Sequence, residues 1–136
     1  MKLGFIGTGQ ISKAVINGIL NSRLNYKKIY ISKRNFTISK ELSKKSKKIQ
    51  ILNDNQKILN LSNWIFLAVT PNVGKKILKN LKFKKNHIIV SFISTIKMND
   101  LKKFIRVKST IVRAIPLPPI SLKKGPIPIF PPNNKV

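Results

Sequence analysis

Short apolar runs alternate along this chain with stretches in which apolar residues recur at helical spacing. Residues 3–7 (LGFIG) have the continuous apolar character of a buried strand. The stretch that follows has apolar or small residues at positions that share one helix face: Ile11, Ala14, Val15, Gly18 and Ile19. The beginning of the chain therefore predicts a strand, a glycine-containing turn and an amphipathic helix.

The same alternation continues to residue 115. Further strands are expected at 27–33, 48–52, 64–69, 87–93 and 109–115. The helices expected between them span 37–47, 55–62, 73–81 and 98–105. Apolar strands separated by helices are typical of a parallel sheet that helices cover on both faces. The pattern therefore predicts an α/β protein with a doubly wound, mainly parallel sheet.

The composition changes at Pro116. Residues 116–136 contain seven of the eight prolines of the chain. Proline cannot continue a helix or occupy the centre of a sheet, so this segment suits extended or edge structure. We therefore expect one domain at 1–115, followed by a proline-rich extended tail at 116–136.

The stretch GTGQIS (7–12) lies between the first predicted strand and the first predicted helix, which is the context of a dinucleotide-binding fingerprint. Gly7 permits a tight turn, and Gly9 leaves room for a pyrophosphate to approach the backbone. The helix that begins near Gln10 directs free N–H groups and the positive end of its dipole at that phosphate. These features predict a Rossmann-type domain; an ordinary tight strand–helix turn is the alternative.

Two small residues complete the fingerprint region. Ser12 occupies the third fingerprint position, where Gly or Ala is usual. Gly18 is expected to allow the helix to pack closely on the sheet.

The end of the second predicted strand bears on the choice of dinucleotide. NAD-binding domains usually place Asp or Glu there to bond the ribose 2′-hydroxyl. This chain instead has Ser32, Lys33, Arg34 and Asn35, without an acid. An arginine beside serine and lysine suits a 2′-phosphate, so the sequence predicts NADP (NADPH) as the cofactor. A solvated basic loop in a lysine-rich chain is the alternative.

The charge of the chain is extreme, with 28 Lys and Arg residues, three Asp and Glu residues, and a formal net charge of +25. Lysine dominates, and isoleucine and asparagine are also frequent. These three residues share A/T-rich codons, so a biased genome accounts for the composition without any function. Nucleic-acid sites favour arginine. A polyanion partner stays an alternative, but specific nucleic-acid binding is not expected.

The chain lacks the residues that several kinds of functional site need. The chain has no cysteine, one histidine (His87) and three dispersed acids, so neither a metal site nor a carboxylate pair is expected. His87 is interpreted as a turn residue before a strand. No apolar stretch is long enough to cross a membrane, and glycines interrupt the apolar start that a signal peptide would need. We therefore expect a soluble cytoplasmic protein with no membrane partner.

Four motifs occur together in a recognisable order: MKLGFIGTGQIS, WIFLAVTP, SFIST and IVRAIP. In these motifs the chain resembles the N-terminal, NADP-binding half of the pyrroline-5-carboxylate reductase family. The resemblance implies a reductase that transfers a hydride from NADPH to a cyclic imine in proline biosynthesis. It covers almost the whole chain.

The resemblance also implies which residues contact the cofactor. The pyrophosphate would lie on Gly7, Thr8, Gly9, Gln10, Ile11 and Ser12. The adenosine side would lie against Ser32, Arg34 and Asn55, and the cofactor would further be lined by Ala68, Val69, Thr70 and Pro71. The nicotinamide side would lie near Phe92, Ile93 and Ser94. As alternatives, Ala68, Val69 and Ile93 are plain core, and Asn55 is a helix cap. No catalytic residue is assigned.

The chain departs from the family pattern at three places. Thr70 stands where the family has lysine, and Thr95 where it has glycine. Leu117 and Pro118 replace an Asn-Thr pair beside the nicotinamide and substrate. The family's C-terminal helical domain, which supplies most of the substrate pocket and the dimer interface, is absent from these residues.

We therefore expect NADPH binding without catalysis by this chain alone. An imine substrate and a homo-oligomer are expected only in a longer form. The alternatives are a non-catalytic NADP-binding or partner-binding module and, less favoured, a basic nucleic-acid-binding protein.

Overall fold

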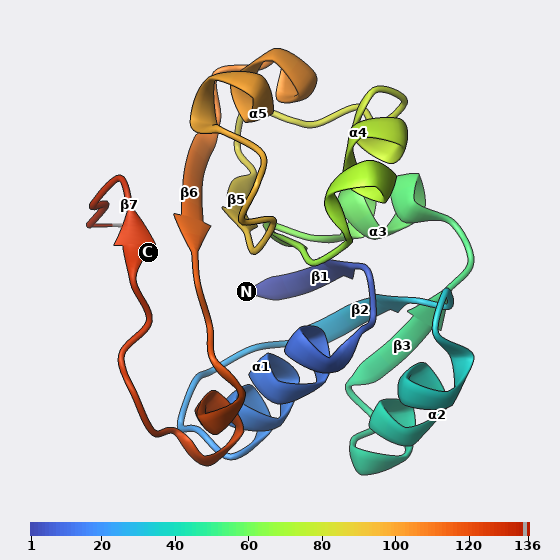
Figure 1. The fold of residues 1–136 in the computed structure, drawn as a ribbon. Helices are drawn as coiled ribbons and strands as arrows, with labels where there is room; N and C mark the ends of the chain where they lie inside the picture. Colours follow the sequence, from blue (N-terminus) through green and yellow to red (C-terminus); the bar gives the residue numbers. More distant parts are fainter. Residues whose placement is uncertain (135) are drawn as a thin grey trace.

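The computed structural model describes residues 1–134 and 136 as a three-layer arrangement in which helices flank a central sheet (Figure 1). The strands are β1 (Lys2–Ile6), β2 (Lys28–Ser32), β3 (Ile49–Leu52), β4 (Trp64–Leu67), β5 (Ile88–Ser91), β6 (Thr110–Ala114) and β7 (Ile129–Phe130). The α-helices are α1 (Gln10–Leu20), α2 (Phe36–Lys45), α3 (Asn55–Leu61), α4 (Pro71–Leu78) and α5 (Met98–Ile105), and a 3₁₀ helix, η1, spans Pro118–Leu122.

The sheet has the strand order β3-β2-β1-β4-β5-β6-β7. Strands β1 to β6 are parallel, and β7 pairs with β6 in the antiparallel direction. Strand β1 lies at the centre, where Gly4 is in register with Tyr30 of β2 and Ile65 of β4. The strand order reverses between β1 and β4, so this sheet has the switch point of a Rossmann-type fold. The predicted doubly wound, mainly parallel sheet is confirmed.

Apolar side chains fill a layer on each face of the sheet, as parallel strands require. On one face, Ile58 of α3, Leu78 of α4 and Leu101 of α5 are fully buried against the strands. On the other face, Ile16 of α1 and Leu42 of α2 are fully buried. The periodic apolar positions of the sequence therefore face the sheet.

Helix α4 begins two residues before its expected start. Pro71 is the first residue of the helix. Proline suits this position because its fixed φ is helical and the first helical N–H has no intrahelical partner to lose.

The proline-rich tail folds back on the domain. In Figure 1 it descends from β6 to η1 beside α1 and then returns to β7 at the sheet edge. A Cβ added to Gly18 would lie 2.6 Å from the carbonyl oxygen of Ile120. The expectation that Gly18 serves helix–sheet packing is therefore wrong, because the close approach is made by the tail. The short strand β7 agrees with the expected edge structure; residue 135 lies outside the described residues, and a further domain beyond the tail stays a prediction.

Candidate nucleotide-binding site

The turn after β1 requires glycine at its first position. Gly7 has a φ of +97°, a conformation that other residues rarely adopt. A Cβ at this position would overlap the carbonyl oxygen of Ala68 and lie 2.7 Å from Cγ1 of Val69. The end of β1 therefore lies directly against the end of β4.

Buried hydroxyl groups brace this turn against β2. The Gly7 N–H donates to Oγ of Ser32 over 3.0 Å, and the Thr8 hydroxyl donates to the Ser32 carbonyl over 2.6 Å. Thr8 and Ser32 are only 2% and 5% exposed. The Ser32 hydroxyl thus has partners within the protein, and its contact with an adenosine phosphate stays a prediction.

Ser12 stabilises the same turn from the helix side. Its hydroxyl donates to the Gly7 carbonyl over 2.7 Å, and the residue is fully buried. Serine at the third fingerprint position therefore adds a hydrogen bond while remaining small enough for the close contact between helix and strand.

Gly9 has a different role from Gly7. It is the N-cap of α1 with a φ of −96°, so its backbone does not require glycine. Apart from Gly9 and its two chain neighbours, no described residue has a heavy atom within 4 Å of the place where its Cβ would lie. The missing side chain therefore leaves open space above the first turn of α1, where Gln10 and Ile11 begin the helix without an acidic neighbour. This space and the free helix N-terminus fit a phosphate.

A hollow of about 430 Å³ opens at this point, at the carboxyl ends of β1, β2 and β4. The residues that line it are Thr8, Gly9, Arg34, Asn35, Phe36, Val69 and Thr70. The structure thus brings together the glycine turn, the basic loop and the end of β4. Within the described chain, the lining contains one charged side chain, the exposed Arg34, and no acid.

The sequence interpretation missed Asn35 and Phe36. Asn35 caps α2, because its side chain accepts a hydrogen bond from the Ile38 N–H over 3.3 Å. Phe36 is 52% exposed, and the Nζ atoms of Lys33 and Lys40 lie 5.6 and 5.9 Å from its ring centroid. The sequence did contain a signal, since Phe36 lies off the i, i+4 apolar stripe that Ile38 and Leu42 form.

Other predicted cofactor residues do not line the hollow. Asn55 is the first residue of α3 and is half-buried. The cap of that helix is Asp54, whose carboxylate accepts from the Gln56 N–H over 2.8 Å, so the alternative that Asn55 is the cap is wrong. Ala68 and Pro71 are half-buried on either side of the Val69-Thr70 pair.

The residues after β5 point in different directions. Phe92 lies on the α1 face, with its ring centroid 5.7 Å from that of Phe66. Ile93 is 2% exposed and packs in the opposite core layer against Gly74, and its N–H donates to Oγ of Ser91 over 3.3 Å, so its contact with a cofactor stays a prediction. Ser94 is exposed, and its carbonyl oxygen accepts a hydrogen bond from Arg113.

His87 lies away from this site, in the turn before β5, as its interpretation as a turn residue requires. Its Nδ1 accepts a hydrogen bond from the Lys84 N–H over 3.1 Å. Burial, followed by the charge of Lys84, lowers the pKa of His87. Elsewhere in the described part of the chain, no three His, Cys, Asp or Glu residues gather as metal ligands. Nor does any helix of those residues have the length and apolar character needed to span a membrane.

Open parallel sheets bind nucleotides at the switch point where this hollow lies, and the fold and the turn together define a Rossmann-type nucleotide-binding domain. Residues 2–95 match the family described as NADP oxidoreductase, coenzyme F420-dependent. The chain belongs to this family.

Curated relatives name a narrower group. Pyrroline-5-carboxylate reductase 3 of Danio rerio is 30% identical over 128 residues, which cover 92% of this chain and 44% of the relative. Pyrroline-5-carboxylate reductase of Arabidopsis thaliana is 27% identical over 84% of this chain and 44% of its own length. The chain thus spans somewhat less than half the length of these relatives.

Solved structures show the same fold. The Plasmodium falciparum pyrroline carboxylate reductase, solved with NADP bound, superposes with a TM-score of 0.80 at 22% identity, covering 99% of this chain and 50% of that one. The Streptococcus pyogenes enzyme gives a TM-score of 0.78 at 22% identity, covering 96% and 48%. The resemblance to the N-terminal NADP-binding half of these reductases is confirmed.

Proposed function

We propose that this chain is the NADPH-binding part of a reductase like pyrroline-5-carboxylate reductase. The observation that carries the proposal is the open space at Gly9, above the N-terminus of α1 and beside Arg34. Nothing in the protein itself fills the place of the missing Cβ among the described residues, whereas a pyrophosphate would.

The cofactor would extend from this point in two directions. Its pyrophosphate would accept hydrogen bonds from the backbone of the turn and the first residues of α1. Its 2′-phosphate would lie against Arg34, with Lys33 and Lys40 nearby, and Val69 and Thr70 would line the adenosine. Asn55 would lie on the adenosine side and residues 92–94 on the nicotinamide side. The preference for NADP over NAD rests on Arg34 and on the absence of an acid in this basic loop.

When bound, NADPH supplies a hydride for the reduction of a C=N bond. The residues of this chain would hold and orient the nicotinamide. A protonated imine is already electrophilic, so positioning is the main contribution required of the protein. This matches a site whose described lining offers no acid or base of its own.

The imine substrate, the homo-oligomer and proline biosynthesis are proposals for a longer form. The carboxyl ends of the strands, from Gly7 to Ile115, make one wall of a cleft. Leu117 and Pro118 stand where the family has its Asn-Thr pair. We therefore propose that this chain binds NADPH but reduces little imine by itself.

The experiment is a titration of NADPH, followed by its fluorescence, against the protein and Gly9→Val. The larger side chain would enter the phosphate space, and we expect binding to fall at least tenfold, as for the loss of one charge-assisted contact of about 1.5–3 kcal/mol. Gln50→Val, at an exposed position of edge strand β3, is the matched control. Unchanged NADPH affinity in Gly9→Val would contradict the proposed site.

The two alternatives make different demands on the structure. A non-catalytic module would bind NADPH in the same way and stay inactive in any longer form. A nucleic-acid binder would need its charge on one face. The lysines instead lie on α2 at one side of the sheet and on α4 and α5 at the other, which favours the nucleotide-binding proposal.

A further inference from the structure

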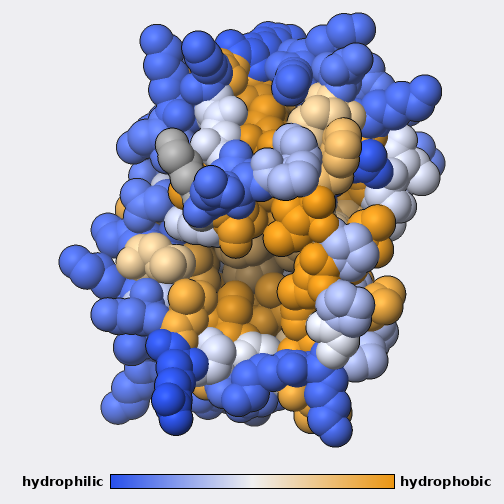
Figure 2. Space-filling view, turned by 90° about the vertical axis from the view of Figure 1, so that its left-hand side faces the viewer, coloured by the Kyte–Doolittle hydropathy of each residue, from blue (hydrophilic) through white to orange (hydrophobic). Residues whose placement is uncertain are grey.

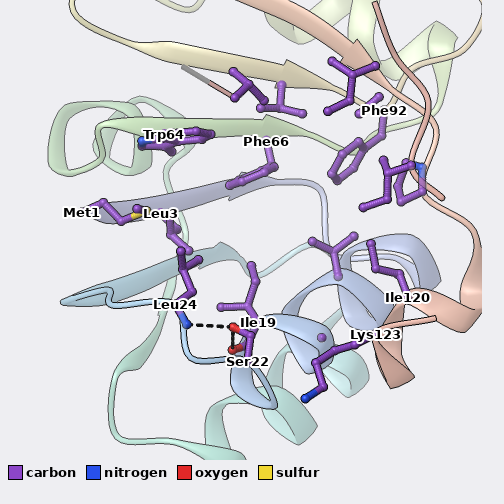
Figure 3. A pocket seen from close by; sticks show the side chains of 18 of the residues that line it. Met1, Leu3, Ile19, Ser22, Leu24, Trp64, Phe66, Phe92, Ile120 and Lys123 are labelled. Atoms are coloured by element: carbon purple, nitrogen blue, oxygen red, sulfur yellow. Dashed lines mark hydrogen bonds between the residues drawn. The ribbon is translucent and has the colours of Figure 1, made fainter. Parts of the chain in front are cut away.

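Aromatic residues have different surroundings in two recesses of the described chain. One recess is a groove of about 460 Å³ on the α1 face of the sheet, which Figure 2 shows as a hydrophobic depression framed by hydrophilic residues. Trp64, Phe66 and Phe92 lie along its sheet side, and α1 and η1 lie across from them (Figure 3). The lining of this groove is mainly apolar. The aromatic residue of the nucleotide hollow, Phe36, instead has basic neighbours.

Phe36 is the first residue of α2 and follows the basic loop at the end of β2 directly. Its side chain is exposed, and it lies off the stripe of Ile38 and Leu42 that packs α2 onto the sheet. The ring is nevertheless part of the lining of the nucleotide hollow, together with Arg34. Its position therefore serves the hollow rather than the core of the domain.

Two ammonium groups lie over this ring. Nζ of Lys33 is 5.6 Å from the ring centroid, and Nζ of Lys40 is 5.9 Å from it. Both distances are within the range of a cation–π contact, in which the negative face of the ring attracts the charge. Lys40 is the i+4 neighbour of Phe36 on α2, and Lys33 precedes Phe36 by three residues in the loop. One ring thus gathers a lysine from the helix and a lysine from the loop.

No carboxylate of the described residues pairs with either of these lysines. The three acids are engaged or placed elsewhere: Glu41 is paired with Lys13 and Lys45, Asp54 caps α3, and Asp100 is in the first turn of α5. The contact with Phe36 is therefore what holds the two ammonium groups near the loop of Arg34. Like charges gathered in this way repel one another, so the arrangement favours an anion beside them.

We propose that Phe36 is a positioning residue for NADP specificity, because its ring holds Lys33 and Lys40 beside Arg34 so that three cations surround the 2′-phosphate. This inference rests on the proposed NADPH site and deepens it. Lys33 and Lys40 do not line the hollow themselves, whereas the ring that both contact does. The ring thus connects the two lysines to the place where the phosphate would lie.

Stacking of the adenine on Phe36 is the competing role for an exposed aromatic residue at a nucleotide site. The two roles differ in the nucleotides that they affect. Stacking acts on the adenine, which NADH and NADPH share, whereas the lysines act on the 2′-phosphate, which only NADPH has. The ratio of the two affinities therefore separates the two roles.

The first measurement needs no nucleotide. An aromatic ring shifts the NMR signals of the ε-methylene protons of a lysine that lies over its face. We expect such ring-current shifts for Lys33 and Lys40 in the unmodified protein and their loss in Phe36→Leu, which keeps an apolar side chain without a ring. Lys44, on the same helix and without a ring contact in the described structure, is the control whose signals should not move.

The second measurement is the ratio of the NADH and NADPH dissociation constants, obtained by competitive titration. Phe36→Leu should lower the preference for NADPH about fivefold or more, while NADH affinity changes little. Phe36→Tyr retains a ring face and should retain the preference. The urea midpoint of each variant checks that the fold is intact.

A double-mutant cycle tests whether the ring acts through a lysine. Lys40→Gln should lower the preference for NADPH in the unmodified protein but hardly further in Phe36→Leu, because the lysine is no longer held there. Lys44→Gln makes the same change of charge on the same helix, away from the ring, and should leave the preference as it is.

Three results would overturn the proposal. One is an equal loss of NADH and NADPH affinity in Phe36→Leu, which would assign the ring to adenine stacking. The others are an unchanged preference in Phe36→Leu and fully additive effects of Phe36→Leu and Lys40→Gln. If the unmodified protein binds neither dinucleotide, the proposed function itself is refuted, whereas binding with a preference that Phe36→Leu leaves unchanged refutes only the role of Phe36.

Discussion

At the scale of single residues, the two glycines of the first turn separate a folding requirement from a binding requirement. Gly7 is held at positive φ against β4, whereas Gly9 has an ordinary φ and open space around it. The fingerprint locates both glycines in the sequence, but it assigns their roles only by analogy with other dinucleotide-binding domains. Only the packing around each one tells which glycine the fold needs.

The paired substitutions Gly7→Ala and Gly9→Ala test this distinction. We expect Gly7→Ala to lower the free energy of unfolding by about 2 kcal/mol or more, because a left-handed conformation costs roughly 1–2 kcal/mol and the Cβ overlaps Ala68. The free energy of unfolding of Gly9→Ala should lie within about 0.5 kcal/mol of that of the unmodified protein. Urea unfolding measures both, and equal destabilisation of the two variants would contradict the assignment.

Arg34→Ala tests the cofactor preference. A charge-assisted bond to the 2′-phosphate is worth about 1.5–3 kcal/mol, so NADPH affinity should fall about ten- to a hundredfold. NADH affinity should change little because NADH lacks that phosphate. Lys33 and Lys40 lie close enough to the loop to retain part of the preference. Competitive titration of both nucleotides measures the ratio, with Lys57→Ala on α3 as the control; equal binding of NADH and NADPH by the unmodified protein would refute the preference.

At the scale of elements, the turn that leads into β5 contains a titratable group, His87, whose neutral form the fold favours. His87 is 2% exposed, and burial lowers its pKa in the folded state. The unfolded chain therefore takes up a proton at higher pH than the folded one. The stability that the neutral histidine provides is complete above its unfolded pKa of about 6.5 and is lost as the pH falls through the folded pKa.

We therefore expect the urea midpoint to fall as the pH is lowered from neutral through about 6.5 and below. His87→Asn retains an acceptor for the Lys84 N–H but does not titrate, so its midpoint should be flatter over that interval. Glu41, whose pKa the hydrogen bond to Lys13 lowers, contributes its own loss only at lower pH, below the ordinary range of a glutamate. If the urea midpoint declines with equal slope in both proteins, His87 is not the cause of the decline.

At the scale of the whole molecule, the described chain has a hollow at the carboxyl ends of its strands, which we propose is one wall of a reductase cleft, and leaves a second surface open on the α1 face of its sheet. Orienting the reactants and excluding water supply several kcal/mol of the barrier reduction in such reactions. A cleft with one wall loses much of that contribution.

The activity prediction follows from this geometry. The chain should bind NADPH yet show little or no NADPH oxidation with pyrroline-5-carboxylate, and a version lengthened to match its relatives should turn over. The loss of NADPH absorbance measures the rate of NADPH oxidation by the two proteins at equal concentration. Robust turnover by residues 1–136 alone would show that one wall suffices, and an inactive longer form would favour the non-catalytic module.

The sequence by itself determined the order of elements, the parallel sheet and the glycine turn, because these depend on local periodicity and on contacts between neighbouring segments. It also placed Arg34 at the right strand end, since the carboxyl ends of adjacent parallel strands meet. Three features were decided only by the tertiary structure: the tail packed on Gly18, the position of Phe36 beside the nucleotide hollow, and the apolar groove around Trp64. Each depends on which distant segments come together, and local patterns of apolar and polar residues do not encode that pairing.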